Sequence, residues 1–176
     1  KTTTISNLAI TYANLGKKTL LVDGDLRKAV IHKVFTTDKS PGFTSYLSGL
    51  ATNLDEIINK TEIDNLEILT SGVSPPNPSE LLESKKMTKF IKEVRKKYDV
   101  ILFDTPPLIA VTDALVIMKH ADQFVLVVRA GYTEKGAFER VYATLAHASF
   151  NIAGVVMNAM TEAHHSYGAG YYYNYY

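Results

Sequence analysis

Three aspartates follow two short apolar runs, and their residue type and spacing suggest metal and phosphate chemistry. The run TLLV ends in Asp23, with Asp25 two positions later, and the run VILF ends in Asp104. Side chains at positions i and i+2 of an extended chain point the same way, and ligands of open α/β sheets bind at the carboxyl ends of strands. We therefore expect the three carboxylates to converge at one sheet edge, where Mg²⁺ would offset their repulsion. Any one of them alone has a simpler alternative role, as the cap of a helix or turn.

Lys1 and Thr2 open a helix-period segment that leads into the first of these strands. In a phosphate-binding loop, a lysine on the first turn of a helix neutralises the β- and γ-phosphates, and the next hydroxyl binds Mg²⁺. We predict that Lys1, Thr2 and Thr3 contact the phosphates of ATP. Thr2, Asp25 and Asp104 form the predicted Mg²⁺ site. The strand and glycine-rich loop of such a site would precede Lys1, and the Lys-Thr pair by itself is a weak signal that an unrelated helix start also explains.

A cluster of tyrosines closes the sequence, after a segment of glycine and alanine that favours flexibility. A kinase needs its acceptor to enter the site in line with the γ-phosphate, and a flexible segment can reach the site of a neighbouring subunit at high effective concentration. The alternative is a low-complexity aromatic segment that only binds other surfaces. We predict a domain over residues 1–160 and a flexible tail over 161–176. The tail holds six tyrosines that would be the phosphate acceptors of such a kinase: Tyr167, Tyr171, Tyr172, Tyr173, Tyr175 and Tyr176.

Short apolar runs alternate with amphipathic segments along the chain, which is typical of a parallel sheet covered by helices on both faces. Five runs have the length and composition of buried strands: residues 19–23, 66–69, 100–104, 124–129 and 152–158. Helix periodicity covers residues 5–15, 85–97, 112–119 and 134–148, and a short helix is expected within 40–54. The proline-rich stretch 74–79 predicts a turn whose Ser79 caps a helix over 80–83. The predicted fold class is α/β, with a doubly wound, mostly parallel sheet.

The composition favours one compact domain and excludes several kinds of site. The chain has 176 residues, of which 46% are hydrophobic, a formal net charge of +1 and no cysteine. The absence of cysteine excludes disulfides, iron–sulfur clusters and cysteine nucleophiles, and the near-neutral charge predicts no nucleic-acid partner. The apolar runs are far shorter than the roughly 20 residues of a membrane span. We therefore expect a cytoplasmic domain, for which any attachment to the inner face of the membrane would come through a partner or a fused segment.

The sequence DGDLRK, which begins at Asp23, resembles the Walker A′ element of the bacterial tyrosine kinases (BY-kinases), the Wzc- and CapB-like regulators of capsule and exopolysaccharide. Further motifs follow in the order of that family: PPNPSELL from Pro75, DTPP from Asp104, VTDA from Val111, VVR from Val127 and GVVMN from Gly154. The resemblance covers essentially the whole chain. It implies a P-loop NTPase fold of the MinD/ParA kind, protein-tyrosine kinase activity, and ATP and Mg²⁺ as cofactors. One departure is Ala29, where the family usually has proline.

The same resemblance implies roles for individual residues. Lys1, Asp23 and Asp25 are the implied catalytic residues. Either Asp23 or Asp25 would orient and deprotonate the acceptor phenol. Asp104 is the implied Walker B carboxylate, which contacts Mg²⁺ directly or through water.

The sequence leaves two possible roles open for each of three further residues. Arg27 is predicted to contact phosphate or a neighbouring subunit, and a solvated basic turn is the alternative. Asn158 is predicted to hydrogen-bond the adenine, and a simple turn asparagine is the alternative. Asp113 either belongs to the site or only favours a helix N-terminus by its charge.

For the whole protein, the resemblance implies an autokinase that phosphorylates its own tyrosine cluster and regulates capsular or exopolysaccharide synthesis and export. The implied partners are a membrane adaptor of the polysaccharide co-polymerase type, further copies of the chain in a ring, and a cognate tyrosine phosphatase. Two alternatives stay open. A MinD/ParA-type partition or division-site ATPase would share the fold but hydrolyse ATP with water. A regulatory scaffold for polysaccharide export would bind nucleotide without transferring phosphate.

Overall fold

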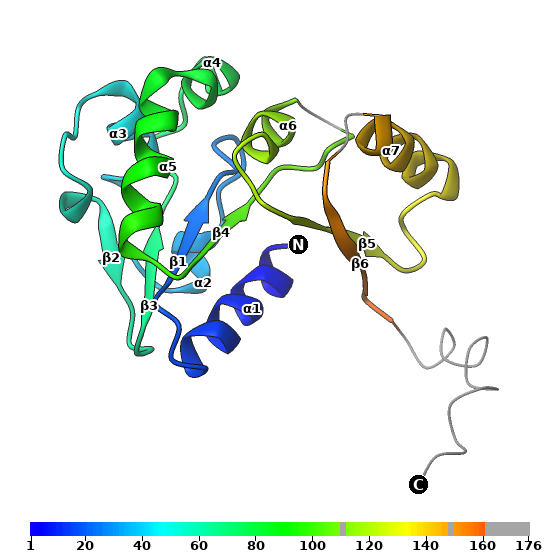
Figure 1. Cartoon of the computed structure of the whole chain (residues 1–176), viewed down its shortest axis with the longest axis horizontal. Helices are drawn as coiled ribbons and strands as arrows, with labels where there is room; N and C mark the ends of the chain where they lie inside the picture. The colour runs from blue at the N-terminus through cyan, green and yellow to red at the C-terminus, as the bar shows by residue number, and fades with distance from the viewer. Residues whose placement is uncertain (110–111, 148–149, 161–176) are drawn as a thin grey trace, which may run out of the picture. The chain divides into compact units, whose positions relative to one another are not determined.

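The computed structural model of the chain describes residues 1–109, 112–147 and 150–160. The chain divides into two compact units, Lys1–Ala121 and Asp122–Tyr176, and each is described by itself (Figure 1). Within the described ranges, no helix is both long enough and apolar enough to cross a membrane. The predicted tail lies outside the described residues, so the division into a domain over 1–160 and a tail stays a prediction.

The first unit is built on a four-stranded sheet with the order β2-β3-β1-β4. Its strands are β1 (Thr19–Asp23), β2 (Ile58–Lys60), β3 (Leu66–Leu69) and β4 (Val100–Asp104). β1 lies between β3 and β4 and is parallel to both, whereas β2 is antiparallel to β3 at the edge of the sheet. The three parallel strands have the bounds that the sequence predicts, and the α/β class with a mostly parallel sheet is confirmed. The sequence does not predict β2, because an edge strand of three residues is too short to show an alternating pattern.

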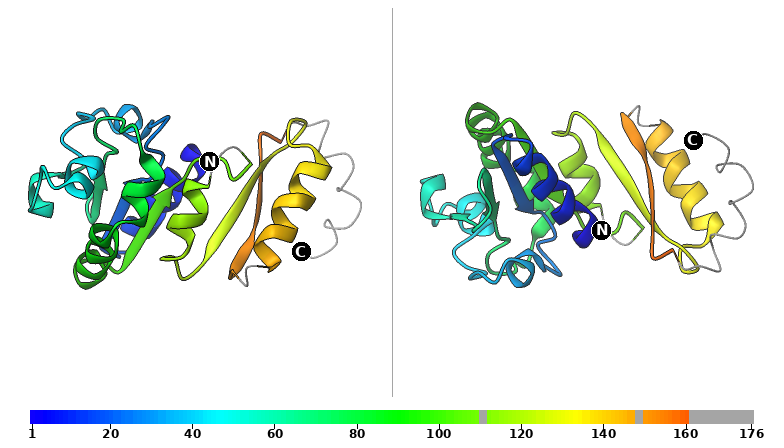
Figure 2. Two further views of the ribbon diagram at one scale, coloured as in Figure 1. Left: turned by 90° about the horizontal axis from the view of Figure 1, so that it is seen from above. Right: turned by 90° about the horizontal axis from the view of Figure 1, so that it is seen from below.

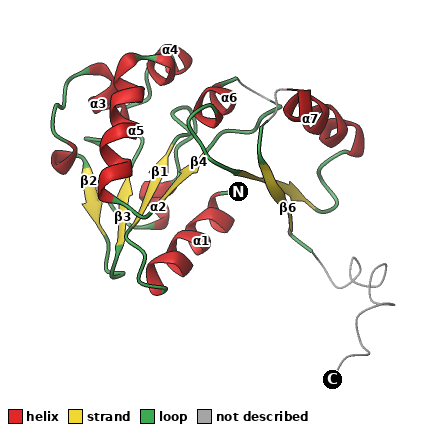
Figure 3. Ribbon diagram, in the orientation of Figure 1, coloured by secondary structure: helices red, strands yellow, loops and turns green. Residues whose placement is uncertain are grey.

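Helices cover both faces of this sheet (Figure 3). They are α1 (Thr2–Asn14), α2 (Ile31–Val34), α3 (Phe43–Ser48), α4 (Pro78–Glu83), α5 (Lys85–Lys97) and α6 (Asp113–Met118), with a 3₁₀ turn at Leu54–Glu56. Leu21 of β1 packs with Ala9 and Ala13 of α1 in one apolar cluster. Leu20 and Val22 pack into a larger cluster on the opposite face. Because alternate β1 side chains enter different clusters, the strand is buried on both faces, as its continuous apolar run predicts.

The two helices that follow β3 show where local sequence signals work and where they fail. α5 has the predicted bounds, and its first turn is capped by Ser84, whose Oγ accepts a hydrogen bond from the Met87 N–H at 3.3 Å. α4 begins at Pro78, one residue before Ser79, and Asn77 occupies the cap position. The predicted cap at Ser79 is therefore wrong, because a proline at the first helical position starts the helix earlier.

Thr36 has a positive φ of 51°, a conformation that costs a β-branched residue about 1–2 kcal/mol. It follows α2, and the Thr37 N–H donates to the His32 carbonyl at 2.9 Å, which is the turn where helices often place glycine or asparagine. We predict that Thr36→Asn raises the free energy of unfolding, measured by urea denaturation, by about 0.5–1 kcal/mol. Thr37→Asn is the control, because Thr37 has no positive φ. An equal gain in both variants would contradict the strain argument.

The second unit contains a parallel strand pair, β5 (Phe124–Arg129) and β6 (Ile152–Asn158), connected through α7 (Lys135–His147). Figure 2 shows α7 lying along this strand pair in both views. Phe124 and Phe150 pack edge to face, with ring centroids 5.6 Å apart. Both strands have the predicted bounds, and α7 begins and ends within one residue of the predicted helix.

Candidate active site

The carboxyl ends of β1 and β4 bring Asp23 and Asp104 side by side, because the two parallel strands pair in register at these residues. The chain leaves β1 through Gly24, whose N–H donates to the Asp104 carbonyl at 2.8 Å. A Cβ at position 24 would lie 2.9 Å from that carbonyl oxygen and 2.8 Å from Ile117 Cδ1, so only glycine permits this close approach. The strand ends therefore place two of the three predicted carboxylates together at one edge of the sheet.

Asp23 is fully buried, with 0% of its surface exposed. Its Oδ2 accepts hydrogen bonds from the Val30 N–H at 3.1 Å and the Ile31 N–H at 3.0 Å, whereas its Oδ1 has no partner among the described residues. Burial raises the pKa of Asp23 to about 6, the hydrogen bond from Ile31 opposes that change, and the charge of Asp104 adds to it. An unpartnered carboxylate oxygen beside a second carboxylate fits a cation such as Mg²⁺.

Thr2, on the first turn of α1, reaches the same place. Its Oγ1 donates a hydrogen bond to Asp104 Oδ2 at 2.5 Å. Burial raises the pKa of Asp104, and the Thr2 hydroxyl and the charge of Lys1 both oppose that change. In P-loop NTPases, a hydroxyl at a helix start and an aspartate at a strand end are the protein groups that hold Mg²⁺. Thr2 and Asp104 therefore have the mutual arrangement that this metal site needs.

Asp25 lies in the loop that follows β1 and is partly exposed. Its Oδ1 accepts hydrogen bonds from the backbone N–H groups of Arg27 at 3.2 Å and Lys28 at 2.8 Å. Such bonds from a side chain to its own turn hold the loop in one geometry. The described residues donate no hydrogen bond to the Asp25 Oδ2, so this oxygen is available to a ligand.

The remaining residues of the predicted phosphate site, Lys1 and Thr3, are exposed at the start of α1. Across the described parts of the chain, no group of three or more His, Asp or Glu side chains is arranged to hold a metal ion. Mg²⁺ in nucleotide sites keeps several waters and uses one or two carboxylates together with phosphate oxygens. Thr2, Asp25 and Asp104 therefore fit Mg²⁺ as part of a nucleotide complex and do not form a complete metal cage.

An ion pair with a buried carboxylate, which the sequence does not predict, lies next to this loop. Arg27 Nε donates to Asp113 Oδ2 at 2.7 Å, and Arg27 Nη2 donates to Asp113 Oδ1 at 3.3 Å. Ser79 Oγ donates to the same Oδ1 at 2.5 Å. The bonds from Arg27 and Ser79 hold the pKa of Asp113 below its ordinary value. Arg27 thus has a carboxylate partner 86 residues away, which no pattern in a single sequence reveals, and its predicted contact with phosphate stays a prediction.

Asn158 ends β6 in the second unit. Its Oδ1 accepts a hydrogen bond from the Ala159 N–H at 2.7 Å, and its carbonyl accepts one from the Ala130 N–H at 2.9 Å. The first bond is local, the second links the end of β6 to the residue after β5, and the predicted contact of Asn158 with adenine stays a prediction. The six predicted phosphate acceptors, from Tyr167 to Tyr176, lie outside the described residues.

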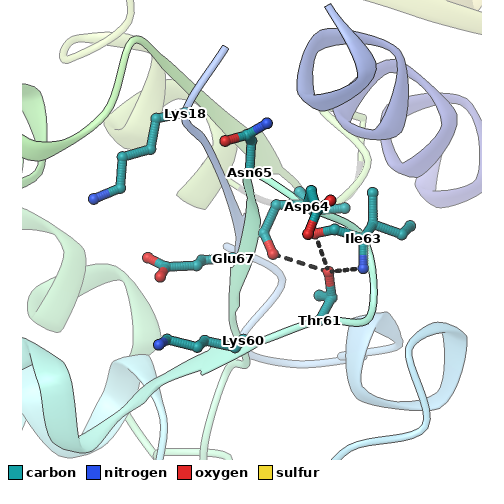
Figure 4. Close-up of a pocket in the computed structure, with 8 residues that line it drawn as sticks. Lys18, Lys60, Thr61, Ile63, Asp64, Asn65 and Glu67 are labelled. Atoms are coloured by element: carbon teal, nitrogen blue, oxygen red, sulfur yellow. Dashed lines mark hydrogen bonds between the residues drawn. The ribbon is translucent and has the colours of Figure 1, made fainter. Parts of the chain in front are cut away.

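A hollow of about 280 Å³ lies at the amino-terminal end of β3, and it contains none of the predicted site residues. Lys18, Lys60 and Glu67 are among its lining residues, with the Glu67 carboxylate between the two amines (Figure 4). Thr61 Oγ1 forms its hydrogen bonds within its own turn. Ligands of open α/β sheets bind at the carboxyl ends of the strands. The candidate active site therefore lies at the opposite ends of the strands from this hollow.

Known proteins resemble the chain over most of its length. The sequence matches the family model of the AAA domain over residues 1–152. It is 40% identical over 172 residues to tyrosine-protein kinase YwqD of Bacillus subtilis (strain 168). The aligned region covers 98% of this chain and 72% of that protein. Among solved structures, the VpsO kinase domain has a TM-score of 0.86 at 36% identity, with 92% of this chain and 79% of that chain covered.

The fold also resembles a division-site ATPase. The septum site-determining protein MinD of Pyrococcus horikoshii OT3, solved as a complex with Mg-ADP, has a TM-score of 0.71 at 27% identity, with 89% of this chain and 64% of that chain covered. Both values are lower than those for the VpsO kinase domain. The P-loop NTPase fold that the motifs predict is therefore confirmed, and the chain belongs to the bacterial tyrosine kinases, the BY-kinase family of P-loop ATPases, and is a tyrosine-protein kinase.

Proposed function

We propose that this chain transfers the γ-phosphoryl group of ATP to tyrosine hydroxyl groups, and first to those of its own C-terminal cluster. The observation that carries the proposal is the Thr2–Asp104 hydrogen bond of 2.5 Å beside the buried Asp23. A helix-start hydroxyl and strand-end carboxylates make up the protein side of a magnesium–nucleotide site. The similarity to MinD, which was solved with Mg-ADP, supports binding of nucleotide and Mg²⁺ by this fold.

The residues at the start of α1 and at the strand ends divide the binding of ATP between them. Lys1 and Thr3 would bind phosphate oxygens, since both are exposed on the first turn of the helix. Thr2 and Asp104 would hold Mg²⁺, which supplies positive charge against the phosphate oxygens, and Asp25 would bind a water of the metal. Asp23, with its unpartnered Oδ1, adds negative charge on the protein side of the metal.

The transfer needs a group that accepts the phenol proton. The phenol oxygen forms a bond to the γ-phosphorus as the bond from that phosphorus to the β,γ-bridging oxygen breaks, ADP leaves, and the proton moves to a carboxylate. Asp25 fits this role better than Asp23, because Asp25 is partly exposed and Asp23 is fully buried. We therefore assign the base to Asp25, and Asp23 keeps an electrostatic role.

In the cell, this activity would regulate the synthesis and export of a capsular or exopolysaccharide. A membrane adaptor would bring the kinase to the inner face of the membrane, and copies of the chain would assemble into a ring in which the tail of one enters the site of the next. Each phosphate adds roughly −1.5 to −2 charges, so a phosphorylated cluster would repel its neighbours and open the ring. A cognate tyrosine phosphatase would reset the cycle.

The test uses the complete protein with ATP and Mg²⁺, and phosphotyrosine is detected by antibody and located by mass spectrometry. We expect label in the C-terminal cluster of the wild type, and a loss of about 100-fold or more in Asp25→Asn, the usual effect of removing a general base. The tail signal should disappear when the six tail tyrosines become phenylalanine.

Asp64→Asn removes an exposed carboxylate from the first unit and serves as the control, which should label like the wild type. Equal labelling of Asp25→Asn and the wild type would contradict the proposed mechanism. Hydrolysis of ATP without any phosphotyrosine in the wild type would favour a MinD-type ATPase instead.

A further inference from the structure

Asp113, the first residue of α6, joins three segments that are far apart in the sequence. Its side chain is 1% exposed, and it accepts hydrogen bonds at 2.7 and 3.3 Å from the Arg27 guanidinium in the loop after β1. A third bond, at 2.5 Å, comes from Ser79 on α4. A buried carboxylate whose lone pairs are satisfied by a guanidinium fork and a hydroxyl holds its partners in a defined geometry.

Arg27 connects this anchor to the proposed catalytic base. The residue that binds Asp113 through its side chain also donates its backbone N–H to Asp25 Oδ1 at 3.2 Å, and the next residue does the same at 2.8 Å. On the other side of Arg27, the carbonyl of the buried Leu26 accepts a hydrogen bond from Ser74 Oγ at 2.9 Å. The loop that carries Asp25 is therefore held from two directions, and one of them is the Arg27–Asp113 pair.

We propose that Asp113 is a positioning residue for Asp25: it anchors the Arg27 side chain and so fixes the backbone N–H groups that orient the Asp25 carboxylate toward the acceptor tyrosine. The proposal rests on the base role that we assign to Asp25 in the proposed function. The Arg27 side chain is 43% exposed, so without Asp113 it would have no fixed position. The loop would then keep only the attachment through Ser74 and Leu26. A misplacement of about 1 Å in a catalytic group can lower a rate by about 100-fold.

An ion pair between α4 and the end of α6 provides a control that distinguishes a positioning role of Asp113 from a role in stability alone. Lys119, the residue directly after α6, and Glu83 of α4 approach to 3.9 Å, and their side chains are 63% and 59% exposed. This pair joins α4 to α6 as the Ser79–Asp113 bond does, but it includes no residue of the loop after β1. Glu83→Gln is therefore the matched control for a role of Asp113 in helix packing alone.

The experiment measures kcat and the KM for ATP of the full-length kinase in tyrosine phosphorylation, at a temperature at which circular dichroism shows each variant folded. We expect Asp113→Asn to lower kcat by about 10- to 100-fold and to leave the KM within about twofold. Ser79→Ala removes one of the three bonds and should lower kcat by about threefold. Glu83→Gln should keep the kcat of the wild type.

Asp25→Asn and the double variant Asp25→Asn/Asp113→Asn complete the set. If Asp113 acts through Asp25, the double variant has the same kcat as Asp25→Asn alone, because effects of residues that act as a unit do not add. A further loss in the double variant equal to that in Asp113→Asn alone would overturn the proposal. So would an unchanged kcat in Asp113→Asn with a lowered melting temperature, which is the signature of a structural role.

If Asp113→Asn does not fold, Ser79→Ala decides in its place, and a wild-type kcat in that variant overturns the proposal. Failure of the proposed function is a separate result, because it appears as a wild type that forms no phosphotyrosine. Failure of the positioning role appears only as a difference between variants of an active wild type.

Discussion

Asp23→Asn is expected to make the protein more stable at pH 8 and to lower phosphotransfer by about 100-fold or more. The carboxyl group is fully buried, and burial raises its pKa from 3.8 to about 6. Keeping it ionised in the folded state at pH 8 lowers the free energy of unfolding by about 3 kcal/mol, since one pKa unit corresponds to about 1.4 kcal/mol. Asparagine keeps an oxygen that can accept hydrogen bonds from the Val30 and Ile31 N–H groups, but it carries no charge.

The stability gain should depend on pH in a defined direction. The folded pKa of Asp23 lies above the unfolded value, so the folded state binds the proton more tightly. The contribution of Asp23 to stability is fully present below about pH 4 and is lost as the pH rises to about 6. The gain of Asp23→Asn over the wild type, from urea denaturation in EDTA, should therefore be small at pH 4 and reach about 3 kcal/mol above pH 6.

Two further measurements complete this prediction. Mg²⁺ with ATP should reduce the gain, because a bound cation stabilises the carboxylate of the wild type and not the amide. Phosphotransfer by the variant should fall by about 100-fold or more, because the metal side of the site loses a buried negative charge. Asp64→Asn, at an exposed position, is the control for removing one carboxylate. A gain of Asp23→Asn that is the same at every pH would show that the buried charge is not its cause.

Phe90→Ala is expected to lower the free energy of unfolding by about 3–5 kcal/mol. Phe90 lies on the inner face of α5 and is 0% exposed. Its ring centroid lies 4.8 Å from that of Phe43, 5.9 Å from that of Tyr46 and 6.4 Å from that of Phe103. These rings belong to α3 and β4, so one truncation opens a cavity where three elements meet. The loss is a large part of the total stability of a typical domain, about 5–15 kcal/mol.

Urea denaturation followed by circular dichroism measures this loss. Phe90→Leu keeps most of the apolar volume and should cost about 1–2 kcal/mol. Leu50→Ala, at a residue that is 87% exposed, is the control and should change the stability by less than about 0.5 kcal/mol. A cost below about 1 kcal/mol for Phe90→Ala would mean that the α5 face collapses around the cavity.

The sequence by itself determined the elements and the residue types of the candidate site. The runs that precede Asp23 and Asp104, LLV and VILF, are apolar at consecutive positions, and such runs are typical of strands in a sheet covered on both faces. Parallel pairing then aligns the carboxyl ends of these strands, so the convergence of the two carboxylates followed from pattern alone. The amphipathic repeat over Lys85–Lys97 likewise sets a helix with one buried face, because its period of 3.6 residues matches that of the helix.

The tertiary structure alone decided which polar groups meet and how deeply each is buried. The pair of Arg27 with Asp113 depends on where α6 and the loop after β1 come together, and side-chain partners 86 residues apart leave no periodic trace in one chain. The partner of Ser79 also depends on the tertiary structure: its hydroxyl, within α4, donates a hydrogen bond to Asp113 and does not cap the helix. Asp23 is fully buried whereas Asp25 is partly exposed, because the solvent exposure of a strand end is set by the elements packed around it.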